Sequence, residues 1–169
     1  MPNFLEITGP VIADTVYADN TLVAKDVGFT LPGINFLTGT VKAMGDMEVP
    51  LIGLLENMQV TITKIGVDKG LGSMNRLEKQ NLEFRWVQSV VKADGSASSQ
   101  GCKAFVRTLP AGFPELGVEV GESTEAENTY NVTRVEIYVS GKEIVYVDRL
   151  AGILRINGKD YYGAIAHLL

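Results

Sequence analysis

Residues 131–157 read NVTRVEIYVSGKEIVYVDRLAGILRIN, and this stretch decides the fold class. In its first half, Val135, Ile137 and Val139 alternate with polar or amphipathic side chains, a pattern typical of a strand with one buried face. Gly141 then falls at the first central position of a two-residue loop, where a glycine favours a type II′ turn. The stretch therefore predicts a β-hairpin.

Apolar side chains lie on both faces of this predicted hairpin. The expected cross-strand pairs are Val139 with Ile144, Tyr138 with Val145, and Ile137 with Tyr146. A hairpin with two apolar faces and free edges aggregates unless another strand pairs with it. We therefore predict that residues 132–147 join the subunits of a homo-oligomer through a lateral sheet. The interface residues are Val135, Ile137, Tyr138, Val139, Ile144, Val145, Tyr146 and Val147.

The composition indicates one soluble domain. Of the 169 residues, 46% are hydrophobic and 21% charged, and no apolar run approaches the ~18 residues of a membrane helix. The N-terminus has neither the basic start nor the long apolar core of a signal peptide. With Cys102 as the single cysteine, we expect cytoplasmic assembly and no internal disulfide. The net charge of −5 disfavours a dedicated nucleic-acid-binding protein.

The remaining patterns favour a mainly β fold, a sandwich or partial barrel of about seven to nine strands with one or two short helices. Residues 1–9 are expected to form a short arm, and Ser73 to cap a helix over residues 73–79. The expected strands are residues 11–17, 21–31, 58–63, 82–87 and 103–109.

Residues 34–55 show no regular pattern, and loops this long are often functional. Such a segment either packs on its own domain or docks on another subunit, and its methionines suit an adaptable contact. The apolar residues that we expect to form this docking loop are Phe36, Leu37, Val41, Met44, Met47, Val49 and Leu51.

The C-terminus is compatible with two structures. Asn157-Gly158 favours a hairpin turn, whereas Asp160 is suited to cap a short helix. The helical spacing of Tyr161, Ile165 and Leu168 favours the helix.

The sequence offers no recognisable active site. His167 is the single histidine and stands next to the C-terminus, and a zinc site needs several cysteine or histidine ligands. Residues 66–72 are glycine-rich but lack the Gly-Lys-Ser/Thr ending of a phosphate-binding loop. We expect no enzymatic activity, no cofactor and no metal. Residues 115–127, which hold five glutamates and no lysine or arginine, are expected to be a solvated edge.

Three motifs together resemble one known family. Residues 23–32 read VAKDVGFTLP, and residues 45–51 read GDMEVPL ahead of the strand pattern at 58–65. The third motif combines GKEI at residues 141–144, Val147-Asp148, and INGKD at residues 156–160. In order and spacing they resemble the major tail tube protein of contractile-tailed phages, which is also used in phage-tail-like bacteriocins.

The resemblance implies a single tail-tube domain over residues 1–169, whose inner sheet continues into a multi-subunit barrel. Such subunits form hexameric rings that stack into a hollow tube, a conduit for DNA and the tape-measure protein or a device for membrane puncture. The implied partners are further copies of the chain, the sheath protein, the tape-measure protein and the baseplate or tube initiator. DNA would be a transient occupant of the lumen, without specific binding. Assembly would occur in the bacterial host cytoplasm, and the product would be a virion tail or a released tail-like particle.

Within that resemblance, residues 34–55 are expected to stack one ring on the next, and Glu136 is a candidate for the lumen. A conduit for DNA should not bind the phosphate backbone, so we expect a net negative bore to which Glu136 or residues 115–127 contribute. The alternative function is a monomeric β-sandwich or barrel that binds a small ligand or glycan at the barrel mouth. A monomer has no evident need for residues 34–55.

Overall fold

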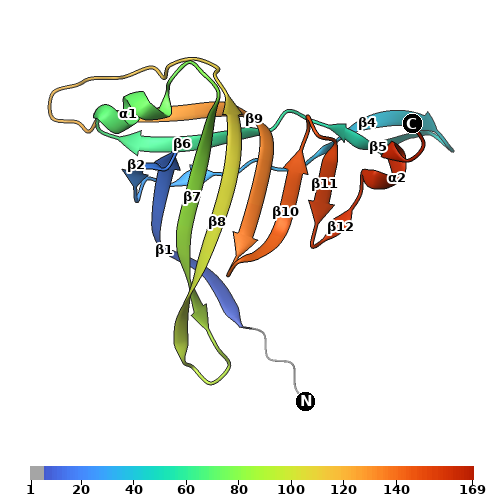
Figure 1. The fold of residues 1–169 in the computed structure, drawn as a ribbon, viewed down its shortest axis with the longest axis horizontal. Helices are drawn as coiled ribbons and strands as arrows, with labels where there is room; N and C mark the ends of the chain where they lie inside the picture. The colour runs from blue at the N-terminus through green and yellow to red at the C-terminus, as the bar shows by residue number, and fades with distance from the viewer. Residues whose placement is uncertain (1–5) are drawn as a thin grey trace.

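The computed structural model describes residues 6–169, which form a curved β body with a projecting hairpin (Figure 1). The predicted mainly β class, a sandwich or partial barrel with one or two short helices, is confirmed, and the antiparallel sheets are open. The elements are β1 (Ile7–Ala18), β2 (Thr21–Lys25), β3 (Phe29–Thr30), β4 (Phe36–Lys42), β5 (Asp46–Leu55), β6 (Gln59–Ile65), α1 (Lys69–Met74), β7 (Gln80–Val91), β8 (Ala97–Leu109), β9 (Glu125–Val139), β10 (Lys142–Asp148), β11 (Ile153–Ile156), β12 (Lys159–Asp160) and α2 (Gly163–Ala166).

There are more strands than the seven to nine expected, partly because predicted segments divide. The expected strand at residues 21–31 breaks after Lys25, where Asp26 adopts a positive φ of 52°, so that β2 and β3 are separate. Residues 34–55 are not an irregular loop. They contain the antiparallel β4–β5 hairpin, in which Gly39 pairs with Val49. The expected arm at residues 1–9 lies partly outside the described residues, and β1 already begins at Ile7.

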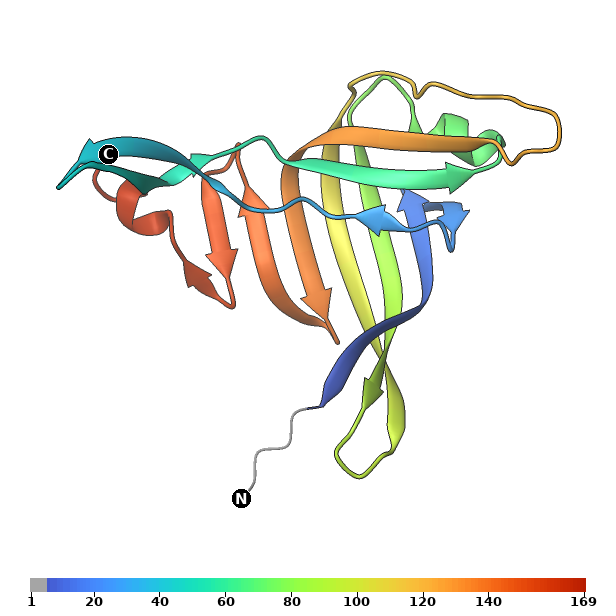
Figure 2. The same ribbon diagram turned by 180° about the vertical axis from the view of Figure 1, so that it is seen from behind.

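A ten-stranded sheet contains one continuous path, β12-β11-β10-β9-β8-β7-β1-β2, while β3 and β6 branch from it. The long strand β9 connects the two layers. Its first part pairs with β6, up to Gln59 opposite Asn131, and its later part pairs with β8 and β10. Seen from behind, β3, β6 and the connection before β4 cross the main path on one side (Figure 2).

The core fills the space between these layers. Register places Val135 of β9 opposite both Val106 of β8 and Val147 of β10, and Phe84 opposite Ala104. Because side chains alternate along a strand, these residues share the inner face of the sheet. The buried apolar cluster comprises Val16, Ala18, Val23, Ala24, Met58, Val60, Ile62, Met74, Leu82, Phe84, Ala104, Val106, Tyr130, Val132, Val135, Val147 and Leu154.

The hairpin at residues 131–147 forms, but its turn and register differ from the prediction. Ser140 and Gly141 both have positive φ, 48° and 79°, which is the type I′ combination and not type II′. The turn therefore lies one residue earlier than expected. A further irregularity falls between Glu143 and Val145. The observed pairs are Lys142 with Val139, Glu143 with Tyr138, Val145 with Ile137, Tyr146 with Glu136, and Val147 with Val135.

The first helix also lies elsewhere than predicted. It begins after Asp68, whose Oδ1 accepts the N–H of Leu71 at 3.1 Å, and it ends at Met74. Ser73 is therefore in the last turn and does not cap a helix over residues 73–79. Asp68 has the preferred N-cap chemistry, and the inward-facing Leu71 and Met74 are buried.

Both structures considered for the C-terminus occur together. A hairpin turn at Asn157 and Gly158 joins β11 to the short β12, so that Ile156 pairs with Lys159. The chain then enters α2, where Asp160 Oδ1 accepts the N–H groups of Tyr162 at 2.9 Å and Gly163 at 3.1 Å. The helix was therefore predicted correctly, but its N-cap is Tyr162, which makes no side-chain capping hydrogen bond, and Asp160 accepts from the turn before the helix instead of capping it. Tyr161 and Leu168 lie outside the helix.

Candidate functional site

Within the described residues 6–169, one face of the main sheet path is not covered by a second layer. Figure 1 is viewed from this side, and the layer of β3 and β6 lies behind it. We call the uncovered surface over β1 and β7–β11 the open face. Across it, strand register aligns one row of side chains from β1 to β11. This row consists of Tyr17, Glu83, Phe105, Glu136, Tyr146 and Arg155.

Three arginines on the open face share one arrangement, in which each contacts a glutamate and a tyrosine ring. Arg85 Nε lies 2.6 Å from Glu83 Oε1, and its guanidinium carbon lies 4.6 Å from the centre of the Tyr17 ring. Such contacts combine a charge-assisted hydrogen bond with a cation–π interaction. We call this arrangement an Arg–Glu–Tyr group.

The other two Arg–Glu–Tyr groups share one ring. Arg134 pairs with Glu136 and lies 5.3 Å from the centre of the Tyr146 ring. Arg155 Nη2 lies 3.1 Å from Glu143 Oε1, and its guanidinium carbon lies 4.8 Å from the same ring centre. The tyrosine thus lies beside two guanidinium groups whose charges are each balanced by a carboxylate.

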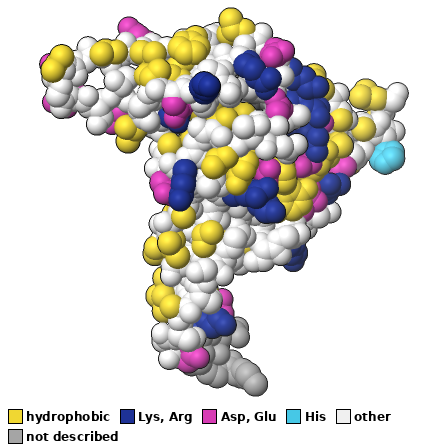
Figure 3. Space-filling model, turned by 60° about the vertical axis from the view of Figure 1, so that its left-hand side comes forward, with side chains coloured by type: hydrophobic (Ala, Val, Ile, Leu, Met, Phe, Trp, Pro, Cys, Tyr) yellow, Lys and Arg dark blue, Asp and Glu magenta, His cyan; other side chains and the backbone are white. Residues whose placement is uncertain are grey.

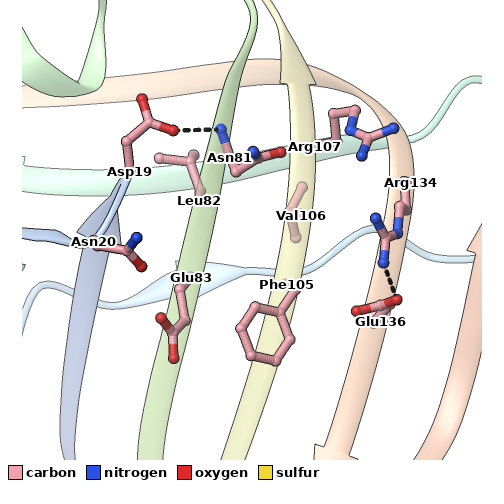
Figure 4. A pocket seen from close by; sticks show the side chains of 10 residues that line it. All are labelled: Asp19, Asn20, Asn81, Leu82, Glu83, Phe105, Val106, Arg107, Arg134 and Glu136. Atoms are coloured by element: carbon pink, nitrogen blue, oxygen red, sulfur yellow. Dashed lines mark hydrogen bonds and ion pairs between the residues drawn. The ribbon is translucent and has the colours of Figure 1, made fainter.

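The pairing also affects the protonation equilibria of these arginines. The hydrogen bond from Arg134 to Glu136 raises the pKa of the guanidinium above its usual value, and Glu83 raises the pKa of Arg85 in the same way. Both side chains are therefore charged at neutral pH. Figure 4 shows Arg134 directed at Glu136 beside a shallow depression of about 300 Å³, with Glu83 and Phe105 on the neighbouring strands.

The open face mixes charges of both signs and is not a purely acidic surface. Figure 3 shows lysine and arginine interspersed with aspartate and glutamate over the body. On β7–β11 the face presents the cations Arg85, Lys103, Arg107, Arg134 and Arg155 and the carboxylates Glu83, Glu136, Glu143 and Asp148. The glutamates of residues 115–127 lie elsewhere, in the loop before β9 and in the part of β9 that pairs with β6.

The residues predicted to join subunits divide between the two faces of the sheet. Alternation places Val135, Ile137, Val139, Val145 and Val147 on the core side, and Tyr138, Glu136 and Tyr146 on the open face. Ile144 lies at the irregularity in β10. Both β9 and β10 already have strand neighbours on each side. Their role between subunits stays a prediction, and only their side chains are free to make such contacts.

The β4–β5 hairpin projects from the body and forms its own two-stranded sheet (Figure 2). Phe36 at its base packs against the core. Other apolar side chains are exposed: Leu37, Val41, Met44, Met47, Leu51, Ile52 and Leu54. Val49 is half-buried. Most residues of the predicted docking loop are thus brought together on one projection, although their contact with another subunit stays a prediction.

The C-terminal part of the chain holds the base of this hairpin. Arg149 donates from its guanidinium to the carbonyl oxygens of Leu55 at 3.1 Å and Glu56 at 3.4 Å. Gly53 lies so close to the Tyr162 ring that an added Cβ would come within 3.0 Å of it. The direction of the projection is therefore fixed by residues that follow it by about a hundred positions in sequence.

The sequence patterns did not lead us to predict the Arg–Glu–Tyr groups. One signal was present, because Glu83 and Arg85, like Arg134 and Glu136, stand two residues apart within strands. At that spacing both members lie on the same face of a strand. The tyrosines come from neighbouring strands, so their positions depend on register, which the sequence did not provide.

Other chemistry is limited in the part of the chain that the structure describes. Among residues 6–169, no three histidine, cysteine, aspartate or glutamate side chains lie together so that they could hold a metal ion. Their helices include none long and apolar enough to cross a membrane. Cys102 is buried between strands, and burial raises the pKa of its thiol. A buried thiol with a raised pKa is a poor nucleophile.

Comparison with known proteins identifies the family. No curated protein matches the chain. A family profile described as phage tail tube protein FII matches residues 11–168, nearly the whole length. The matched range includes residues 23–32, 45–51 and 141–160, which carry the three motifs noted in the sequence. The chain therefore belongs to the phage tail tube protein FII family and is a structural subunit of a phage tail tube.

Proposed function

We propose that the chain forms hexameric rings, that these rings stack into the inner tube of a contractile tail or tailocin, and that the open face lines the lumen. The observation behind this proposal is that a tube-family sheet has one face packed on a core and the other uncovered. A sheet with that asymmetry suits a wall between protein and a water-filled channel, because its alternating residues meet both environments. The contractile type and the sixfold ring follow from the resemblance of residues 23–32, 45–51 and 141–160.

Within a ring, neighbouring subunits contact each other through side chains of the open sheet and of its outer strands. The strands at the two ends of the path, β2 and β12, each have a single partner in the path. When one end of the sheet in each subunit meets the other end in the next subunit, and this contact repeats around a rotation axis, the subunits form a closed ring. The tape-measure protein and passing DNA then contact the open face, while the sheath protein and the tube initiator contact the rest of the assembly.

Between rings, the β4–β5 hairpin makes the axial contact. Its exposed apolar residues lie on a projection that adds little to the core of its own subunit. A projecting apolar surface on a soluble protein is a typical site of protein association. The firm attachment of its base to Arg149 and Tyr162 gives the projection a defined direction.

The test is to shorten the hairpin without disturbing its register. Gly39 pairs with Val49, so residues 40–48 are replaced by Asn-Gly, which forms a tight turn. Light scattering and negative-stain microscopy compare ring and tube formation with those of the unmodified chain. We expect folded subunits that form rings but no long tubes.

The matched control shortens the other long hairpin by the same number of residues. Ser89 pairs with Ser99 at the far end of β7 and β8, so residues 90–98 are replaced by Asn-Gly. We expect this variant to form tubes. Tubes of normal length from the β4–β5 variant would contradict an axial role for that hairpin, and a strict monomer at high concentration would contradict the whole proposal.

A further inference from the structure

The open face has cations that would ordinarily attract a polyanion. Arginine binds phosphate in a bidentate manner and is the preferred side chain for contacts with nucleic-acid backbones. Five cations lie on this face of β7–β11: Arg85, Lys103, Arg107, Arg134 and Arg155. Left unpaired, they would give a surface with salt-sensitive affinity for any passing phosphate backbone.

Three of these cations are already engaged within the subunit. In each Arg–Glu–Tyr group, the carboxylate accepts a guanidinium hydrogen and the tyrosine ring lies beside the cation. Among residues 6–169, Lys103 and Arg107 have no ion-pair partner. The face therefore divides into three neutralised arginines and two available cations.

The carboxylates of these groups are held in place. The side chains of Glu136 and Glu83 are 9% and 13% exposed, and the glutamates lie in strands with neighbours on both sides. Ion pairs at a protein surface are weak stabilisers, so stability alone gives little reason for three of them on one face. Their larger effect is on the charge that the face presents to a ligand.

We propose that Glu83, Glu136 and Glu143 keep the three arginines of the open face from binding nucleic-acid phosphates. Lys103 and Arg107 are then the cations of the open face that remain available, so a phosphate polymer is held more weakly than it would be by all five. This inference rests on the proposed function, in which the open face lines the tube. The sequence led us to expect a bore with a net negative charge. In the present inference, a glutamate instead neutralises each of the three arginines locally.

The experiment measures DNA binding by the full chain directly. The variant E83Q/E136Q/E143Q removes the three carboxylates and keeps the size of each side chain. Binding of a short fluorescent DNA duplex is followed by fluorescence anisotropy from low to physiological salt. We expect weak binding by the unmodified chain and a large gain in the variant, with a plot of log K against log salt steeper by about 0.9 for each arginine that contacts a phosphate.

The matched control is E115Q/E119Q/E122Q, which makes the same change in net charge within the exposed loop before β9. We expect no comparable gain. An equal gain in both variants shows that net charge alone controls binding and overturns the inference. No gain in either, or tight binding by the unmodified chain, overturns it as well.

Folding and assembly are kept separate from this result. Circular dichroism checks the triple variant. If it does not fold, the single variant E143Q decides the question, because the Glu143 side chain is 26% exposed and, among residues 6–169, forms an ion pair with Arg155 alone. For E143Q we expect a slope change of about 0.9 relative to the unmodified chain, and an unchanged slope overturns the inference. Failure to form tubes would remove the proposed function and still leave the comparison of binding readable.

Discussion

The β body and the β4–β5 hairpin both consist of antiparallel strands with many apolar side chains, but they use those side chains differently. In the body, Ile62 and Phe84 are fully buried between layers. In the hairpin, Ile52 and Leu54 are more than half exposed, and no second layer covers their sheet. Apolar area stabilises a subunit only when it leaves water. The body therefore accounts for most of the stability of the subunit, whereas the hairpin leaves much of its apolar surface in contact with water.

The largest expected effect comes from the same substitution made in each region. Ile62→Ala removes a side chain with 0% exposure, and we expect it to lower the free energy of unfolding by about 2–5 kcal/mol. Ile52→Ala removes a side chain that is 55% exposed, and we expect a change of less than about 0.5 kcal/mol. Urea denaturation of the two variants, followed by circular dichroism, measures both values.

We expect the effects of the two substitutions on tube assembly to have the opposite order. Ile52→Ala is expected to shorten tubes while leaving the subunit stable, if the hairpin makes the axial contact proposed above. Equal destabilisation by the two substitutions would show that the hairpin is part of the subunit's own core, and the distinction between the regions would be lost.

A smaller effect is expected where the two regions meet. Gly53 has φ of +99°, and an added Cβ would come within 3.0 Å of Tyr162 and 3.1 Å of Ile165. We expect Gly53→Ala to cost about 1–3 kcal/mol through backbone strain and crowding, and to speed hydrogen exchange in β4, β5 and α2. Hydrogen-exchange mass spectrometry measures that change.

The control for this prediction is Gly45→Ala at the tip of the same hairpin. Gly45 also has positive φ, +119°, but an added Cβ would meet no atom within 4 Å. The control therefore reports backbone strain alone. If Gly53→Ala and Gly45→Ala have the same effect on α2, the contact with Tyr162 does not hold the hairpin to the body.

The smallest effect concerns acid stability at α1, within the body. Partial desolvation opposes ionisation of Asp68, but the Leu71 N–H and Lys64 outweigh it and hold the pKa of the carboxyl below its usual 3.8. Because the folded pKa is lower than the unfolded one, the charged form stabilises the fold above about pH 4, and this stabilisation is lost as pH falls through the folded pKa.

Asp68→Asn keeps the capping oxygen and removes only the charge. With the carboxyl 59% exposed, we expect a loss on the order of a few tenths of a kcal/mol near pH 7, since solvent screens the pair with Lys64. The difference between variant and unmodified chain should shrink below about pH 4 in urea titrations. A difference that grows on acidification would contradict the lowered pKa.

Local patterns predicted the fold class and several elements. Alternation predicted strands at residues 58–63, at residues 82–87 and in the first half of residues 131–157, because a strand with one buried face has a period of two. These segments lie in or overlap β6, β7 and β9, of which β7 and β9 are longer than predicted. The motifs at residues 23–32, 45–51 and 141–160 indicated the tube family, which the family profile confirms. The short C-terminal helix was also predicted from local spacing, although its N-cap is Tyr162 and not Asp160.

The register of the strands and the identity of their neighbours could not be predicted from the sequence. The shift in the β10 pairing arises from a type I′ turn at Ser140-Gly141 and an irregularity near Ile144, and one residue of slip changes every pair. The apolar residues on both faces of this hairpin suggested a free edge, yet β8 and β11 already occupy both sides. The Arg–Glu–Tyr groups likewise depend on strands that are far apart in sequence.

The position of β9 in the chain has a consequence for how the protein folds during synthesis. Its residues 125–139 complete the pairing of β6 in one layer and of β8 in the other. Until the ribosome has released residue 139, β6 and β8 each present an unpaired edge, the kind of edge that drives misassociation of nascent chains. Neither layer closes before the last fifth of the chain emerges, so folding is late, non-local and slow relative to that of helical proteins of similar length.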